Sequence, residues 1–208
     1  MNNERLSAIL IWGGACLAVC LSLYLISNQI ASRISVHYSM YLEVEKDIPL
    51  IPWMIYIYAS FHLLLALNFF IIKDPKVIKA FTISLMCSSF IAVIFFLVFP
   101  GELGFSRTEN IVGYEPMFNL LHQIDHPFNL YPSLHITFSV LTAFAMFDQT
   151  KSKLFHVILL IWILLICCSV VLVHQHHLFD VITGLTLAYG VVKLVYRRMI
   201  SSVYKTPS

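Results

Sequence analysis

Charged residues are scarce in this chain of 208 residues, and their scarcity argues against a soluble fold. Lysine, arginine, aspartate and glutamate make up 12% of the sequence, apolar residues make up 59%, and the mean hydropathy is +0.83. The chain has no basic run of the kind that binds nucleic acid. It has instead uncharged apolar runs of about 17–25 residues, the length that crosses a bilayer as a helix.

Cysteine is also sparse, and its placement does not suggest a disulfide framework. Each cysteine lies inside an apolar run, as is typical of core or lipid-facing residues. The five are Cys16, Cys20, Cys87, Cys167 and Cys168.

The apolar runs predict an all-α, polytopic membrane protein with one domain, residues 1–208, built as a bundle of six transmembrane helices. A signal peptide is the alternative for the first run, but its apolar region is normally only about 7–15 residues long. We therefore expect the first run to remain as a span. The expected spans are about Ser7–Ile26, Trp53–Ile72, Val77–Phe99, Pro132–Phe147, Leu154–Val173 and Phe179–Tyr196.

The distribution of lysine and arginine predicts the orientation of the bundle. Three cations lie on one side, namely Arg33, Lys46 and Arg107. Ten lie on the other side, and the positive-inside rule places these ten in the cytoplasm together with both termini. The outer face then carries the loops near Arg107, His135 and His176. The ten are Arg5, Lys73, Lys76, Lys79, Lys151, Lys153, Lys193, Arg197, Arg198 and Lys205.

A first candidate motif is Pro132-Ser133-Leu134-His135, at the start of the fourth span. Proline suits the first position of a helix, where its missing N–H leaves no partner unsatisfied. The following backbone N–H groups point out of the helix end and favour an anion such as phosphate. His135 would reach the same anion. The alternative is a plain helix cap followed by a histidine packed in the bundle.

A second candidate motif is the pair His176 and Asp180, which precedes or opens the sixth span. Residues spaced i and i+4 share a helix face. A carboxylate bound to one imidazole nitrogen fixes the tautomer and leaves the other nitrogen as a nucleophile or base. The alternative is an ordinary ion pair at a helix start, although ionisable residues at a membrane interface favour a function.

Taken together, the two segments resemble the superfamily of type 2 phosphatidic acid phosphatases and vanadium haloperoxidases. That superfamily carries P-S-G-H and, one helical crossing later, S-R-x5-H-x3-D. This chain has P-S-L-H at 132–135, then Ser169-Val170 followed by His176 and Asp180 at the same spacing. The resemblance implies a catalytic core of about residues 99–198.

The resemblance also implies roles for the site residues. His176 would attack phosphorus to form a phosphohistidine, with Asp180 orienting it. His135 would protonate the leaving oxygen, and Ser133 and Arg107 would bind the substrate phosphate. The implied substrate is a membrane lipid, with water or an alcohol as acceptor, and no cofactor or metal is expected.

Departures from the family pattern point towards one branch of it. The family's first motif, K-x6-R-P, is reduced here to Arg107-Thr108, with Pro100 at the lysine position, and Val170 replaces the arginine of the third motif. Fewer cations favour a less charged substrate such as a phosphodiester. The P-S-L-H sequence and the paired His176-His177 are similar to inositol phosphorylceramide and sphingomyelin synthases, which transfer head groups, and shorter stretches are similar to bacterial members.

Three alternatives remain open at this point. The enzyme could be a lipid phosphatase or phosphotransferase, or it could be a head-group transferase of the branch just named. A non-catalytic protein that binds or transports lipid phosphates would use the same ionisable residues. A zinc site formed by His135, His174, His176 and His177 would explain less well why an aspartate, Asp180, lies four residues after His176. The resemblance places the protein in a bacterial inner membrane, and the loop from Asp125 to Asn129 receives no catalytic role.

Overall fold

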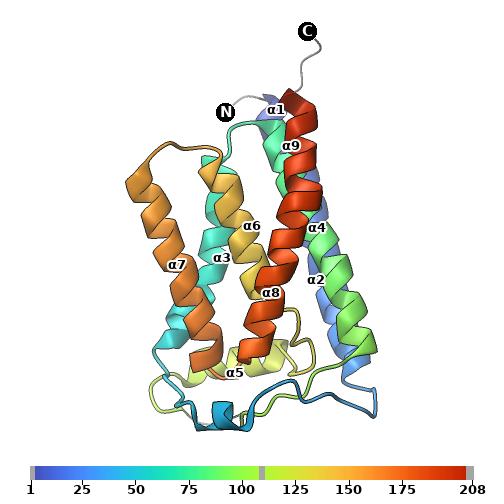
Figure 1. Cartoon of the computed structure of the whole chain (residues 1–208), viewed down its shortest axis with the longest axis vertical. Helices are drawn as coiled ribbons and strands as arrows, with labels where there is room; N and C mark the ends of the chain where they lie inside the picture. Colours follow the sequence, from blue (N-terminus) through green and yellow to red (C-terminus); the bar gives the residue numbers. More distant parts are fainter. Residues whose placement is uncertain (1–2, 108–110, 205–208) are drawn as a thin grey trace.

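The computed structural model describes residues 3–107 and 111–204, and within these ranges the chain is helical with no strand. The first long helix is continuous through α1 (Asn3–Ala8), η1 (Ile9–Gly13) and α2 (Gly14–Ala31). The last is continuous through α8 (Leu178–Val191), η3 (Val192–Tyr196) and α9 (Arg197–Tyr204). Between them lie η2 (Glu43–Asp47), α3 (Met54–Ile71), α4 (Pro75–Val98), α5 (Glu115–Ile124), α6 (Leu134–Phe147) and α7 (Lys153–Leu172). The long helices run side by side along one axis (Figure 1).

The expected helical membrane fold is confirmed, but the count of six spans is not. Five helices in the described ranges are long and apolar enough to cross a membrane: Asn3–Ala31, Met54–Ile71, Pro75–Val98, Lys153–Leu172 and Leu178–Ser201. The fourth predicted span is present as α6, which is apolar but has only 14 residues. At about 1.5 Å per residue it is about 21 Å long, shorter than a hydrocarbon core of about 30 Å.

Local signals explain where several helices begin and end. The Asp74 side chain accepts a hydrogen bond from the Lys76 amide at 2.8 Å, and Pro75 opens α4. This is a favourable cap because it satisfies a donor that lacks an intrahelical partner. The last turn of α3 is satisfied by the Arg5 guanidinium, which donates to the carbonyl oxygens of Phe69, Phe70 and Ile72. A cation at that end also complements the helix dipole.

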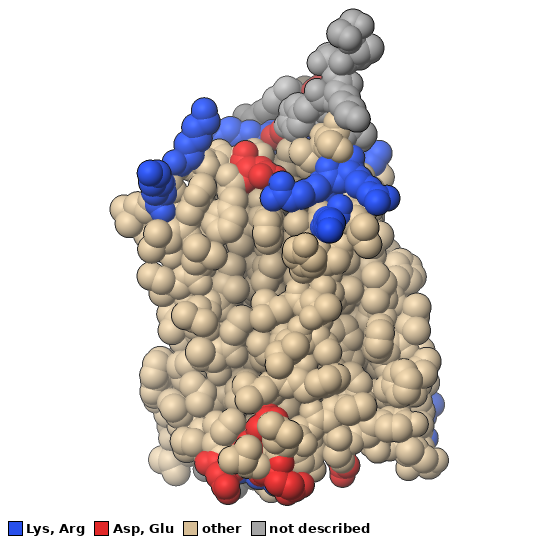
Figure 2. Space-filling model, viewed as in Figure 1, with Lys and Arg blue, Asp and Glu red and all other residues tan. Residues whose placement is uncertain are grey.

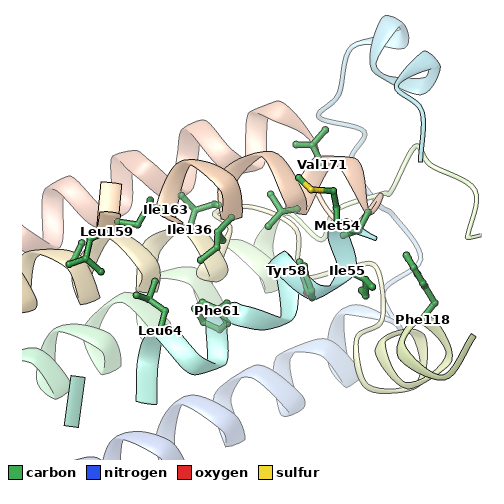
Figure 3. Packing of buried hydrophobic residues seen from close by; sticks show 14 of the residues in the cluster. Met54, Ile55, Tyr58, Phe61, Leu64, Phe118, Ile136, Leu159, Ile163 and Val171 are labelled. Atoms are coloured by element: carbon green, nitrogen blue, oxygen red, sulfur yellow. The ribbon is translucent and has the colours of Figure 1, made fainter. Parts of the chain in front are cut away.

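Helix α6 is the centre of the bundle, because it packs against α3, α4, α7 and α8. One hydrophobic cluster fills the space between α3, α6 and α7 and includes Leu64, Ile136 and Ile166 (Figure 3). A second cluster lies between the first helix, α4, α6 and the last helix, with Phe81, Leu141 and Tyr196 at its centre. The two candidate motifs of the sequence lie at the starts of α6 and α8, and these two helices contact each other.

The two ends of the bundle differ in charge. Lysine and arginine gather at the end that carries both chain termini, whereas aspartate and glutamate gather at the other end (Figure 2). The short helices α5 and η2 lie at the acidic end, across the ends of the long helices (Figure 1). The band between the two ends is almost free of charged side chains, as expected for a membrane-facing surface.

The connections at the acidic end are ordered by contacts between distant parts of the chain. Tyr38 forms an isolated parallel bridge with Gly101, with hydrogen bonds of 2.9 Å to Pro100 and 3.0 Å from Glu102. The long connection predicted at 100–130 contains α5, whose Phe118 is buried in the first cluster. These segments form a layer over the starts of α6 and α8.

Candidate functional site

Asp180 lies in the first turn of α8 and reaches back over the helix start. One carboxylate oxygen, Oδ2, accepts the His177 backbone N–H at 2.8 Å and lies 3.2 Å from His176 Nδ1. The predicted pairing of His176 with Asp180 is thus present, but not on a shared helix face. His176 precedes the helix and His177 is its N-cap. Asp180 acts as the acidic residue of a capping box does.

The turn that carries His176 is held by the end of α7. His174 adopts a left-handed backbone conformation with φ of 57°, which turns the chain sharply after the helix. The carbonyl oxygen of Val170 then accepts the backbone N–H groups of both Gln175 and His176, at 3.0 and 2.9 Å. Val170, which replaces the family's arginine, has its side chain fully buried in the hydrophobic core. It supports the turn through its backbone and brings no charge to the site.

The start of α6 differs by two residues from the sequence prediction. The helix begins at Leu134 with Ser133 as its N-cap, and Pro132 lies before it after a cis peptide bond, so Pro132 is not the first helical residue. The Ser133 backbone N–H donates to the Asp180 carbonyl oxygen at 3.2 Å. The contact is close because α8 has glycine at 184, where a Cβ would lie 2.7 Å from the Ser133 carbonyl oxygen.

This packing brings the two predicted catalytic histidines together. The ring centroids of His135 and His176 are 5.7 Å apart and the planes meet at 64°. His135 is placed by the rings of Tyr58 and Phe61 on α3, with centroid distances of 4.7 and 4.8 Å. Within the described residues, His176 Nε2 has no hydrogen-bond partner, whereas Nδ1 faces Asp180. The nitrogen that the sequence predicts as nucleophile is therefore the free one.

Arg107 lies near the site but binds the protein backbone. Its terminal nitrogens donate to the carbonyl oxygens of His122 at 3.3 Å and Asp125 at 2.6 Å. Two buried polar atoms in this region, Arg107 Nε and Ser133 Oγ, have no partner within the described ranges. Both belong to residues for which the resemblance implies binding of the substrate phosphate. Thr108, the partial match to the family motif, lies outside the described residues.

Asp125 is a candidate site residue that sequence reasoning missed. Its carboxylate accepts a hydrogen bond from the Tyr24 hydroxyl of the first helix. Burial raises the pKa of Asp125, while the Tyr24 hydrogen bond and the nearby His176 and Arg107 oppose that rise. The missed signal was the position of Asp125 ten residues before His135, at the end of an amphipathic segment that the structure shows as α5.

A small cavity of about 10 Å³ lies beside the His176 turn and is lined by Arg107, His174 and Gln175 among others. It has room for about one water molecule.

Of the predicted site residues, His135, His176, Asp180 and Ser133 are joined by direct contacts, and Arg107 is linked to them through Asp125. The described residues hold no group of three or more histidine, cysteine, aspartate or glutamate side chains arranged to bind a metal ion.

Two comparisons with known proteins bear on this site. A comparison with curated proteins gave no match. A family model described as the PAP2 superfamily matches residues 29–194, which include every predicted site residue. The likeness that the two short motifs suggested therefore extends over most of the chain, and this chain belongs to the PAP2 superfamily, whose members point to a phosphatase- or phosphotransferase-type activity.

Proposed function

We propose that this protein is an integral membrane enzyme that cleaves or transfers the phosphate group of a lipid through a phosphohistidine at His176. The observation that carries the proposal is the pairing of His176 Nδ1 with Asp180 while its Nε2 is free and His135 stands opposite. A carboxylate on one ring nitrogen orients an imidazole and makes the other nitrogen a better nucleophile. A protein that only binds lipid phosphate has no need of this arrangement.

The steps follow from the positions of the two histidines. His176 Nε2 attacks phosphorus, the ester P–O bond breaks, and His135, which enters this step as the imidazolium, gives a proton to the departing alkoxide. In the second half, water or an alcohol attacks phosphorus and the N–P bond breaks. His135, now neutral, accepts the proton of the incoming nucleophile, so both histidines return to their starting states. Ser133 Oγ and the first N–H groups of α6 bind the phosphate oxygens.

The small number of cations at the site supports a second candidate function, that of a head-group transferase of the inositol phosphorylceramide or sphingomyelin synthase type. Val170 is buried in the core and Arg107 donates both terminal nitrogens to carbonyl oxygens. Of the three cations in the family motifs, Arg107 alone is then present to balance a phosphomonoester dianion. A phosphodiester carries a single negative charge and suits such a site better.

We also propose that the catalytic end faces away from the cytoplasm. Of the ten cations in the sequence prediction, the nine within the described residues belong to the end where lysine and arginine gather (Figure 2). The starts of α6 and α8, which carry the candidate site, lie at the opposite, acidic end (Figure 1). The positive-inside rule then gives cytoplasmic termini and an outward-facing site. For a bacterial protein this site would open to the periplasm or the cell exterior.

The test is a panel of phospholipids incubated with the purified protein, with and without small alcohols, followed by chromatography of the products. We expect phosphate or head-group release by the wild type and none by His176→Ala. A rapid quench followed by mass spectrometry should find a phosphate on His176. Head-group exchange only when an alcohol is present would select the transferase. Lipid binding without any product in the whole panel would contradict the proposal and favour a binding protein.

A further inference from the structure

The proposed mechanism leaves unexplained a cluster of aromatic and histidine rings beside His176. Phe105 is parallel to His174 at 4.0 Å and to His177 at 4.4 Å, measured between ring centroids. At these distances one imidazole must lie on each face of Phe105. The other side of His177 stacks on Tyr41 at 4.6 Å. The stack joins the segment before η2, the segment after α4 and the turn before α8.

Hydrogen bonds hold the same three segments together. Glu45 Oε2 accepts the Leu178 N–H at 2.8 Å and lies 3.2 Å from His177 Nδ1, and its Oε1 accepts the Leu42 N–H at 2.9 Å. The Gly104 backbone N–H points at His177 Nε2, 3.0 Å away. Glu45 and His177 are 2% and 1% exposed, respectively, so water does not replace these bonds.

The partners determine the tautomer of His177. A backbone N–H can only donate, so Nε2 must carry a lone pair and accept from Gly104. The ring proton is then on Nδ1 and is donated to the Glu45 carboxylate. Burial lowers the pKa of His177, although Asp180 and Glu45 oppose this shift, so the ring is neutral at neutral pH. Burial disfavours the charged form of Glu45 and so acts to raise its pKa. Hydrogen bonds from Leu42, Leu178 and His177 outweigh this effect and keep the pKa of Glu45 below its usual value.

We infer that His177, held by Glu45 and Gly104 in its Nδ1–H form, is a positioning residue for the adjacent nucleophile His176. The inference rests on the proposed function and adds the side chains of His177 and Glu45 to the residues that support catalysis. Both nitrogens of His177 are engaged, which explains why the free nitrogen of the His176-His177 pair belongs to His176. The same bonds tie the turn to the segment that contains Gly104 and Phe105.

A proton on His177 Nε2 would break this arrangement, because two donors would then face each other at Gly104. Asp180, Glu45 and the neighbouring His176 are the titratable groups that face His177 most directly. His174 lies beyond Phe105, and Lys46 lies over the outer face of Tyr41 at 5.0 Å. We therefore expect the Gly104 contact to be lost on acidification, as His177 gains a proton.

Three substitutions separate the contacts of His177. His177→Phe keeps a ring in the stack and removes both hydrogen bonds. His177→Gln can keep an acceptor for Gly104, and His177→Asn can keep a donor for Glu45. A misplaced reacting group can cost about 10²-fold in rate. We expect a loss of that order in kcat for His177→Phe, a smaller loss for Gln and Asn, and KM within about threefold of wild type.

Glu45→Gln tests the carboxylate, with Glu43→Gln as the matched control. Glu43 is in the same η2 turn, but its side chain is 82% exposed and pairs only with Lys46 among the described residues. We expect Glu45→Gln to lower kcat and Glu43→Gln to leave it unchanged. The tautomer itself is read from the ¹⁵N resonances of labelled histidine, assigned by loss of the signal in His177→Gln and followed from pH 8 to pH 5.

The outcomes separate this inference from the proposed function. A proton on Nε2 of His177 at neutral pH overturns the inference whatever the activity. Wild-type kcat in His177→Phe overturns the positioning role and leaves the phosphohistidine proposal standing. An inactive wild type counts against the proposed function, while the resonances still decide whether Glu45 and Gly104 hold the stated tautomer. Nδ1–H together with a selective loss of kcat supports the inference.

Discussion

The imidazoles of His135 and His176 meet edge to face with their ring centroids 5.7 Å apart, although the residues come from different helices. The proposed nucleophile and the proposed proton donor therefore lie beside each other at one end of the bundle. The contact depends on α6 and α8 starting next to each other at the acidic end of the bundle.

Replacing His135, the proposed proton donor, should lower kcat mainly for substrates whose leaving group needs a proton. We expect His135→Ala to lose about 10²–10⁴-fold in kcat with an alkyl phosphate ester. With a nitrophenyl ester, whose leaving group is stable as an anion, the loss should be much smaller. His156→Ala is the control, because His156 lies in the first turn of α7 at the basic end of the bundle, with its Nε2 against the Thr150 carbonyl oxygen. Equal losses with both esters would show that His135 does not donate the proton.

Asp180→Asn should inactivate without unfolding. The amide oxygen can take the place of Oδ2 and still face both the His177 N–H and His176 Nδ1. It carries no negative charge, so it no longer stabilises the positive charge that the His176 ring gains as it attacks phosphorus. We expect a loss of at least about 10²-fold in kcat. Asp148→Asn is the control, since Asp148 binds the Tyr196 hydroxyl at the opposite end. Stopped-flow rates and thermal unfolding in detergent measure both properties.

Adding one methyl group at the contact of α6 and α8 should disturb the site. Gly184→Ala would place a Cβ 2.7 Å from the Ser133 carbonyl oxygen and 3.1 Å from Ile136 Cβ. Overpacking of this kind typically costs about 1–3 kcal/mol. We expect lower thermal stability and lower activity together. Gly190→Ala in the same helix meets nothing within 4 Å and serves as the control. If both variants behaved alike, close approach at Gly184 would not be what limits the packing.

Asp125 should make folding stability depend on pH in a defined direction. Burial raises its pKa in the folded protein, so the folded state binds this proton more tightly than the unfolded state does. Such a group favours folding below its unfolded pKa of about 3.9, and the contribution is lost as pH rises through the folded pKa. Asp125→Asn should therefore raise the unfolding temperature at pH 8, and the gain should shrink towards pH 5. A gain that grew on acidification would contradict the direction of the shift.

The orientation of the bundle can be tested by labelling in intact cells. In a cysteine-free background, single cysteines replace Lys151 at the basic end and Val112, which is 88% exposed at the acidic end. An impermeant maleimide should react at position 112 and not at position 151. Lysed cells, in which both positions should react, provide the control. The opposite pattern would place the catalytic end in the cytoplasm.

The sequence predicted the helical membrane fold because apolar runs are a strong signal that tertiary packing cannot hide. It located five spans to within about five residues at each end, and it misjudged the first turn of α6. There the Pro132 signal was read as a helix start, but the chain begins the helix only at Ser133 and Leu134. Helix boundaries of this kind are set by contacts, here by the bond between Ser133 and Asp180, which no local pattern shows.

The contact between His176 and Asp180 was predictable because a histidine and an aspartate four residues apart remain close in a turn as well as in a helix. Glu45 was not predictable in the same way. It lies 132 residues from His177, and its partners are brought to it only by the folding of three separate connections. Asp125 was missed for a similar reason, since its link to Tyr24 spans 101 residues. Long-range contacts between polar side chains leave no periodicity in the sequence.

The length of α6 has a consequence for the lipid. The helix is about 21 Å long at 1.5 Å per residue, so it is about 9 Å shorter than a hydrocarbon core of about 30 Å. Its Phe147 end lies near Asp148 and Arg197 at the basic end, so the shortfall lies at the end with Ser133 and His135. The reacting phosphorus atom would then lie deeper in the bilayer than the phosphates of the surrounding head groups. A bilayer meets such a mismatch by thinning locally, so turnover should be faster in short-chain than in long-chain lipid vesicles.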